Sequence, residues 1–230
     1  IWYTPVSGIW QSVWLETVPE TRFLSYEAVA DIDTKSLTVK TLTKGTAEGD
    51  IILAEVLEGG VGYSPEKPAE KVIASAKAAE GKAVTVTLPE VKTWSPDSPY
   101  LYGLRLSVIR GGKVLDRVEG YAAMREISVV TDSHNYKRMA LNGKPLFQFG
   151  PLDQGWWPDG LYTAPTDEAL RYDIVKTKEL GFNMIRKHIK IEPARWYFHC
   201  DQLGMMVWQD MPSIADNSTN KWVYNNWDEG

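Results

Sequence analysis

The sequence predicts a multidomain β plus α/β fold, in which an all-β unit is followed by an α/β unit. Up to about Leu141, short runs of alternating apolar residues lie between clusters of Gly, Pro, Asp and Ser, which is typical of β-strands. After Gly143 the hydrophobic period lengthens, and helix-like segments alternate with strand-like ones. A length of 230 residues with 43% hydrophobic residues allows two domains, each with its own core.

The charge balance argues against two classes of partner. The chain has a net charge of −5 and a pI of about 5.3, whereas nucleic acids and anionic membranes are bound by clustered Lys and Arg. No apolar run reaches the roughly 18 residues of a transmembrane helix. Cys200 is the single cysteine, which excludes an internal disulfide framework and a cysteine-based zinc site. These features leave the cellular compartment open.

Strands of the all-β unit are expected where alternating or β-branched runs lie between turn residues, at 36–42, 50–57, 82–88, 101–109 and 113–121. Repeated strands at this spacing, with no helical period between them, indicate an all-β sandwich. Residues 70–80 (EKVIASAKAAE) look helical in composition, but they lack a capping residue and are followed by Gly81. We therefore predict a strand and a variable loop there.

The α/β unit alternates strands and helices. Strands are predicted at 145–150, 182–188 and 205–210, and helices at 167–180 and 193–203. Thr166 can cap the first helix and Gly181 ends it, while Pro193 suits the first position of the second helix. This order requires a parallel sheet, which begins either an α/β barrel or a doubly wound sheet. Neither strand-to-helix turn carries G-x-G-x-x-G, so dinucleotide binding is not supported.

Four stretches, in this order, resemble glycoside hydrolase family 2, which includes β-galactosidases, β-glucuronidases and β-mannosidases. They are SGIWQSVWLE (7–16), WSPDSPYLYGLRLSV (94–108), the run from GYAAMREI to LNGKPLFQFG (120–150), and LGFNMIRKHIKIEPARWYFHCDQLGMMVWQDMP (180–212). The resemblance implies the end of a jelly roll at 1–16, an immunoglobulin-like β-sandwich at 17–127, and the first part of a TIM (β/α)8 barrel at 128–230. It also implies an internal fragment, cut at both ends.

Members of that family are retaining glycosidases that cleave terminal β-linked sugars, so the resemblance implies a carbohydrate partner and no organic cofactor. Two carboxyl groups about 5–5.5 Å apart act as acid and nucleophile, and in the family both are glutamates on later barrel strands. The resemblance thus implies that both lie beyond Gly230 and that this chain holds no catalytic residue. Glu229 follows Asp rather than the family's Asn and precedes any fourth strand, which weighs against a catalytic role.

This chain can supply part of the rim around the substrate, because barrel enzymes bind at the carboxyl ends of their strands. Arg186 and His188 end the second predicted strand, two residues apart, so alternation points them the same way. In the family, Arg, two residues and His are common here, but this sequence has Arg-Lys-His, with Ile189 at the position of that histidine. The resemblance implies that Arg186 holds a catalytic carboxylate. His188 can alternatively be satisfied by neighbouring backbone.

Other candidates for sugar contact follow the same strand ends. Asp153 and Asp210 can each bind a sugar hydroxyl or cap the following turn. Trp156 and Trp157 can stack on a pyranose ring or serve packing, and for Trp208 a core position is favoured. Packing or loop positions are expected for His199, Cys200 and His134, and three scattered histidines indicate no metal site.

Two alternatives remain open. A non-catalytic carbohydrate-binding or adhesion module could be built on the sandwich, but it has no need of the βαβαβ segment within residues 143–212. A different barrel hydrolase or a pseudoenzyme is the other alternative. Because three parallel strands cannot close a barrel of eight, the third strand is expected to leave an open edge, with local disorder or self-association through it.

Overall fold

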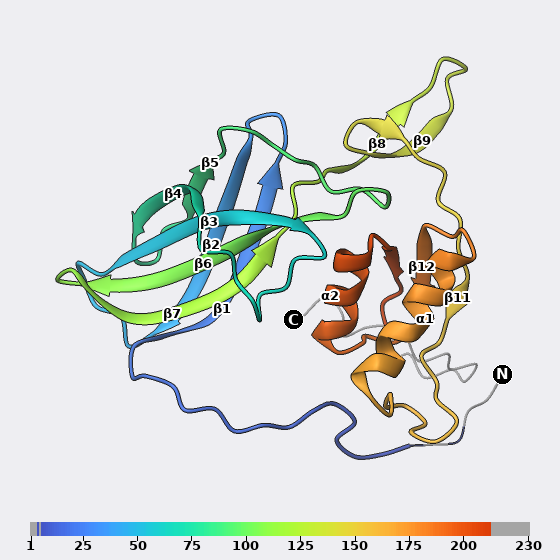
Figure 1. The fold of residues 1–230 in the computed structure, drawn as a ribbon, viewed down its shortest axis with the longest axis horizontal. Helices are drawn as coiled ribbons and strands as arrows, with labels where there is room; N and C mark the ends of the chain where they lie inside the picture. The colour runs from blue at the N-terminus through green and yellow to red at the C-terminus, as the bar shows by residue number, and fades with distance from the viewer. Residues whose placement is uncertain (1–3, 5, 213–230) are drawn as a thin grey trace, which may run out of the picture.

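The computed structural model describes residues 4 and 6–212, which form an antiparallel sandwich, a projecting hairpin and an α/β unit (Figure 1). One sheet of the sandwich has the order β1-β2-β5, with β1 (Arg22–Asp31), β2 (Ser36–Lys44) and β5 (Val84–Thr87). The other has the order β4-β3-β6-β7, with β4 (Val72–Ala79), β3 (Ile51–Val61), β6 (Tyr100–Arg110) and β7 (Lys113–Ala122). The predicted sandwich is confirmed, and the ambiguous stretch 70–80 contains strand β4.

Alternation along the strands builds the core of the sandwich. In β5, Val84 and Val86 are buried, whereas Thr85 between them is exposed and its hydroxyl lies 3.1 Å from that of Thr38 on β2. Buried side chains of both sheets meet in one cluster, which is Leu37, Val39, Ile52, Ala54, Val56, Val84, Val86, Leu88, Tyr102, Leu104, Leu106, Val108, Ala122 and Met124. Burial of this apolar area provides the main stabilisation of the unit.

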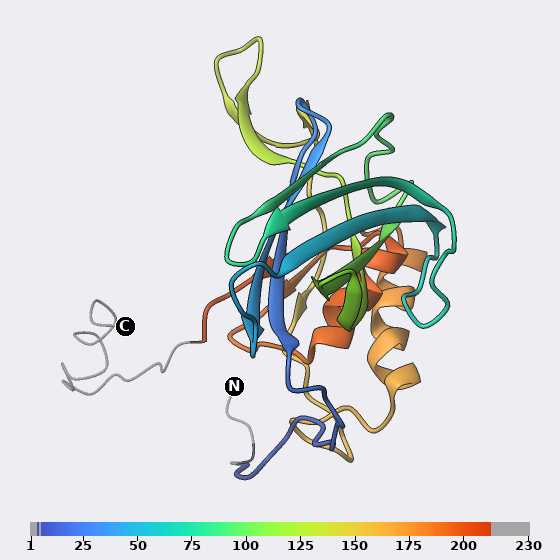
Figure 2. The ribbon, with the colours of Figure 1, turned by 90° about the vertical axis from the view of Figure 1, so that its left-hand side faces the viewer.

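Strand β1 and the hairpin of β8 (Ile127–Thr131) and β9 (Lys137–Leu141) were not predicted from the sequence. The alternation of β1 is broken, because its pairing register with β2 shifts between Phe23 and Ser25. Much of the hairpin is exposed, and it projects from the rest of the chain in both views (Figures 1 and 2). In β8 the apolar residues Ile127 and Val129 are themselves exposed, so alternation there does not mark a buried face.

The α/β unit has the predicted order and the predicted parallel sheet. Its elements are β11 (Leu152–Asp153), α1 (Asp167–Glu179), β12 (Met184–Lys187), α2 (Ala194–Leu203) and β13 (Met206–Gln209), with the sheet order β11-β12-β13. The hydroxyl of Thr166 accepts a hydrogen bond from the backbone N–H of Ala169 (3.1 Å), which confirms the predicted cap of α1. Both helices pack on one face of the sheet through Leu170, Ile174, Ile185, Trp196, Cys200 and Met205.

Two predicted positions in this unit are wrong. The first strand of the parallel sheet is β11, at residues 152–153, rather than 145–150, where only β10 (Lys144–Pro145) pairs, with β9. Pro151 has no backbone N–H, and the chain at Gly150 lies so close to β12 that a Cβ there would come 1.6 Å from the Met184 carbonyl oxygen. Pro193 precedes α2 as its N-cap rather than occupying the first helical position.

The segment 7–16, predicted as the last strand of a jelly roll, forms no strand. No strand among the described residues pairs with this segment. From the α/β unit it passes beneath the sandwich towards β1 (Figures 1 and 2). At the α/β unit the Thr163 hydroxyl donates to the Trp10 carbonyl oxygen (2.9 Å), and the Arg195 guanidinium donates to the Ser12 hydroxyl (3.2 Å). Apolar side chains of the segment, including Ile9, Val13 and Leu15, are exposed.

Strand β13 is expected to be the weakest strand of the described chain. It pairs on one side only, with β12, so the backbone groups of its other side face outward. In amide hydrogen exchange we expect 206–209 to exchange faster than β3 and β6, or to become protected only as the chain self-associates. A monomer in which 206–209 were as protected as the sandwich core would contradict this prediction.

No helix among residues 4 and 6–212 is long and apolar enough to cross a membrane.

Candidate functional site

An ion pair joins the carboxyl ends of β12 and β13. The Nε and Nη2 atoms of Arg186 each lie 3.0 Å from one carboxylate oxygen of Asp210, a bidentate arrangement that fixes both side chains. Hydrogen bonding by Arg186 is the largest cause that lowers the pKa of Asp210 below its usual range. The side chain of Arg186 is 46% exposed, so the pair faces solvent and can accept a ligand.

His188 lies close enough to this pair to act on it. Its positive charge, when protonated, also lowers the pKa of Asp210, after the effects of Arg186. The half-buried His188 donates its backbone N–H to the Asp153 carbonyl oxygen (2.9 Å), which ties it to the end of β11. The structure therefore brings Arg186, His188 and Asp210 together at one edge of the parallel sheet.

The open face of the sheet carries a row of side chains on neighbouring strands. Leu152, Arg186 and Trp208 are register partners across β11, β12 and β13, so their side chains lie on the same face. The sequence favours a core position for Trp208. Among the described residues Trp208 is instead 42% exposed, and its indole N–H donates to Gln148. This face lies opposite the helices and includes the Arg186–Asp210 pair.

Asp153, expected to bind a sugar hydroxyl or to cap a turn, lies apart from that face. It is the register partner of Lys187, and its Oδ2 lies 2.6 Å from the Lys187 ammonium, which is 1% exposed. Its other carboxylate oxygen accepts a hydrogen bond from the backbone N–H of Gly155 (2.7 Å), as expected of an aspartate that caps a turn. Asp153 thus serves a buried ion pair and a turn.

A buried charge network, missed in the sequence, surrounds this ion pair. Glu192 places its Oε1 2.9 Å from Lys187 Nζ and 3.1 Å from Lys190 Nζ, and all three side chains are almost fully buried. The pKa of Lys190 is lowered, chiefly by burial of its ammonium. The charge of Glu192 acts in the opposite direction and raises it. On α1, burial and then the charge of Asp153 raise the pKa of Asp173. The run RKHIKIE looks like a mixed surface cluster, and only the fold pairs its charges.

The two tryptophans after β11 have different environments. Trp156 is half-buried and lies edge-on to Tyr162, with ring centroids 5.9 Å apart. Trp157 packs against the helix layer, and its backbone is paired twice with Leu161, at 2.7 and 3.0 Å. This pairing closes the tight turn 156–161, in which Trp156 is half-buried and Trp157 belongs to the helix layer.

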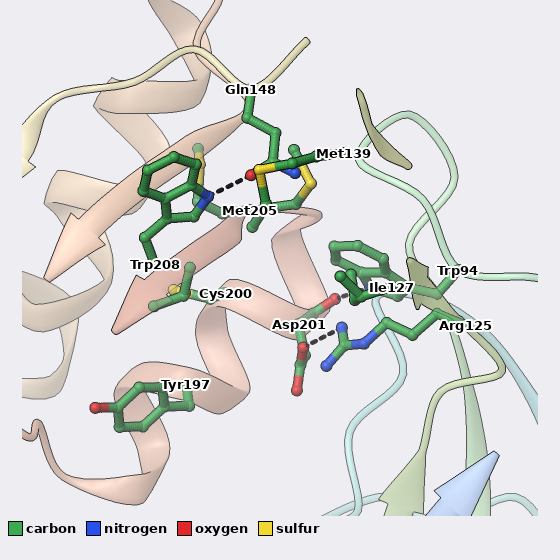
Figure 3. A pocket seen from close by; sticks show the side chains of 12 residues that line it. Trp94, Arg125, Ile127, Met139, Gln148, Tyr197, Cys200, Asp201, Met205 and Trp208 are labelled. Carbon is green, nitrogen blue, oxygen red and sulfur yellow. Dashed lines mark hydrogen bonds and ion pairs between the residues drawn. The ribbon is translucent and has the colours of Figure 1, made fainter. Parts of the chain in front are cut away.

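A pocket of about 300 Å³ lies beside β13, where the sandwich, the β8–β9 hairpin and β13 meet (Figure 3). Its lining includes Trp94, Met139, Met206 and Trp208, with Asp201 and its partner Arg125 in the wall (Figure 3). One oxygen of Asp201 lies 2.6 Å from Arg125 Nη1, and the other accepts from the Tyr121 hydroxyl at 3.0 Å. The backbone oxygen of Asp201 accepts from the Trp94 indole (2.7 Å), so this residue fastens α2 to the sandwich.

The remaining histidines and the cysteine lie as the sequence indicated. His199 is buried with its Nε2 3.0 Å from Asp167, Cys200 is buried in the helix layer, and His134 is an exposed loop residue. Burial raises the pKa of the Cys200 thiol well above its usual value. Among the residues that the structure describes, no three His, Cys, Asp or Glu side chains are grouped so that they could hold a metal ion. Glu229 lies outside the described residues.

Comparisons with known proteins point to one family. Residues 20–125, which span the sandwich, match the family model of glycosyl hydrolases family 2. A β-galactosidase of Thermoanaerobacter pseudethanolicus is 24% identical over 233 residues, which cover 96% of this chain and 29% of that protein. A β-galactosidase of Enterobacter cloacae is 28% identical over 214 residues, which cover 88% of this chain and 20% of that protein. The chain thus spans less than a third of the length of these relatives.

Solved structures show the same fold. The FMN-binding β-glucuronidase from Facaelibacterium prausnitzii L2-6 matches with a TM-score of 0.70 and 21% identity, over 85% of this chain and 30% of that chain. The β-glucuronidase from Ruminococcus gnavus in complex with D-glucuronic acid matches with a TM-score of 0.68 and 17% identity, over 85% of this chain and 31% of that chain. The family model matches the sandwich of this chain, and the two β-galactosidases extend the similarity to glycosyl hydrolases family 2 over most of its length.

Proposed function

We propose that this chain is part of a retaining β-glycosidase and supplies the rim of its sugar site. In this proposal the sandwich of residues 17–127 is the immunoglobulin-like domain, and residues 128–230 begin a TIM barrel whose further strands belong to another part of the protein. The two catalytic glutamates are placed on those further strands, so this chain alone is not expected to hydrolyse glycosides. No organic cofactor enters the proposed reaction, because the carboxyl pair alone carries out retaining hydrolysis.

The observation that carries the proposal is the exposed Arg186–Asp210 pair at the carboxyl ends of parallel strands. Barrel enzymes place their active sites at these strand ends. The guanidinium provides N–H donors and the carboxylate provides acceptors, which is the combination needed to bind sugar hydroxyls or to hold a further carboxylate. His188 beside the pair adds ring nitrogens that can donate or accept a hydrogen bond.

The proposed substrate class is a terminal β-linked hexose or hexuronic acid. Relatives of this chain include β-galactosidases, and structural neighbours include a β-glucuronidase solved with D-glucuronic acid. A cationic Arg186 is compatible with both sugars, since it can bind a neutral hydroxyl as well as a carboxylate. The α/β unit also weighs against the alternative of a binding or adhesion module, which would need the sandwich only.

Replacing Arg186 with alanine should weaken binding of p-nitrophenyl β-galactoside or β-glucuronide to this chain by about tenfold or more, the loss typical of a charge-assisted hydrogen bond. The same change should raise the pKa of Asp210 towards its usual value, because Arg186 is the main cause of its lowering. Titration calorimetry measures the first effect, and a ¹³C-detected carboxyl titration measures the second.

A matched control is Arg138→Ala. Arg138 forms a similar ion pair with Asp132, at 2.8 Å, but does so on the hairpin away from the strand ends. Its replacement should leave glycoside binding unchanged. If the wild-type chain and the Arg186→Ala variant bound the glycosides with equal affinity, Arg186 would not be part of the sugar site. A wild-type chain that binds neither glycoside would contradict the proposed function.

A further inference from the structure

Lys190 is a buried cation that the proposed function does not yet use. Its side chain is only 2% exposed, and it lies in the loop between β12 and α2. Burying an ammonium is costly unless each of its donors is satisfied. Its three N–H groups meet three acceptors, which are the carbonyl oxygens of Gly155 (2.6 Å) and Tyr162 (2.9 Å) and Oε1 of Glu192 (3.1 Å).

The two carbonyl oxygens lie on either side of one turn. Gly155 precedes the tight turn 156–161 and Tyr162 follows it, so a single ammonium holds both ends of the turn together. Gly155 itself packs closely on the network, because a Cβ there would come 2.1 Å from Oε1 of Glu192. Gly155 also has a φ of +61°, a conformation that favours glycine.

Aromatic rings complete the surroundings of this ammonium. Lys190 Nζ lies 4.4 Å from the ring centroid of Tyr162 and 5.2 Å from that of Trp10, within the range of cation–π attraction. Tyr162 in turn contacts both Trp10 (4.6 Å) and Trp156 (5.9 Å) edge-on. The cation therefore fixes the turn through its backbone and the aromatic side chains through their rings.

We propose that Lys190 is a positioning residue, which holds the turn 155–162 so that Tyr162 and Trp156 stand at a fixed place beside the strand ends for contact with a sugar ring. The inference rests on the proposed function, because it assigns a role in that same site. A lysine suits the position, because its compact ammonium directs three donors to three converging acceptors, whereas the planar guanidinium of arginine does not. A pre-ordered aromatic surface binds a sugar ring without paying the entropy of ordering it.

The test compares wild type, Lys190→Met and the surface control Lys71→Met, by hydrogen exchange and by binding of p-nitrophenyl β-galactoside and β-glucuronide. Lys190→Met should speed amide exchange at 155–162 by about tenfold or more while β3 and β6 stay protected. Its glycoside affinity should fall by about tenfold, because the turn must then be ordered on binding. Lys71→Met, at an exposed position of the sandwich, should change neither quantity.

A further variant separates positioning from general stability. Tyr162→Leu keeps the backbone carbonyl that Lys190 binds, so it should weaken glycoside binding without faster exchange across 155–162. If Lys190→Met does not fold, Lys190→Arg keeps the charge beside Glu192 and serves in its place.

Unchanged exchange at 155–162 in the Lys190 variant would overturn the proposal, and so would faster exchange with unchanged affinity. A wild-type chain that binds neither glycoside would instead overturn the proposed function, and with it the sugar-facing role of the turn.

Discussion

Replacing Lys187 with methionine should lower the free energy of unfolding of the α/β unit by about 3–5 kcal/mol, the range found when one partner of a buried ion pair is removed. Lys187 is 1% exposed and lies 2.6 Å from Asp153 and 2.9 Å from Glu192. Without it, Asp153, whose side chain is 23% exposed, would lose its cation, while Glu192 would keep Lys190. Urea unfolding followed by far-ultraviolet circular dichroism measures the loss.

The double variant Lys187→Met/Asp153→Asn provides the control for charge. It removes the uncompensated carboxylate, so it should recover part of the lost stability. A single variant as stable as wild type at neutral pH would show that the network contributes no net stability.

Replacing Asp201 with alanine should uncouple α2 from the sandwich and cost about 2–3 kcal/mol, since two donors lose a charged acceptor. The Arg125 guanidinium (2.6 Å) and the Tyr121 hydroxyl (3.0 Å) both bind this carboxylate, which is 18% exposed. Arg125 also stacks on the ring of Trp94, with 4.6 Å between its Cζ and the ring centroid. Trp94 keeps its hydrogen bond to the backbone of residue 201, so the variant isolates the side-chain contribution.

Differential scanning calorimetry can follow the Asp201 variant, because loss of this contact should let the α/β unit unfold before the sandwich. Asp33→Ala is the matched control, since Asp33 lies exposed in the turn between β1 and β2. A single transition at the temperature of the control would contradict a role for Asp201 in joining the two units.

Local signals in the sequence were sufficient for much of the fold. Thr166 and the glycine at 181 delimit α1 through their own backbone chemistry, and the valines of β5 alternate with threonines. Strand β1 was missed because its register shift interrupts the alternation, and the β8–β9 hairpin was missed because it is largely exposed. These elements depend on neighbours that local patterns do not encode.

The candidate site divides in the same way. Arg186 and His188 could be placed together from strand alternation, and Asp210 was expected at a neighbouring strand end. The partners of Asp153 could not be predicted, because its pairing with Lys187, 34 positions away, depends on the register of β11 against β12. Lysines in the run RKHIKIE look like surface residues until the helix layer buries them, so tertiary context overrode the local pattern.

The most direct test of the proposed function is hydrolysis of a panel of chromogenic β-glycosides, including galactosides, glucuronides and mannosides. The assay compares this chain with the longer protein of which the proposal makes it a part. We expect hydrolysis by the longer protein and none by this chain, because the two glutamates are assigned to the further barrel strands. Hydrolysis by this chain alone would contradict that assignment, and Asp210 and Glu229 would then be the first carboxylates to replace. Hydrolysis by neither protein would contradict the glycosidase itself and favour a carbohydrate-binding module.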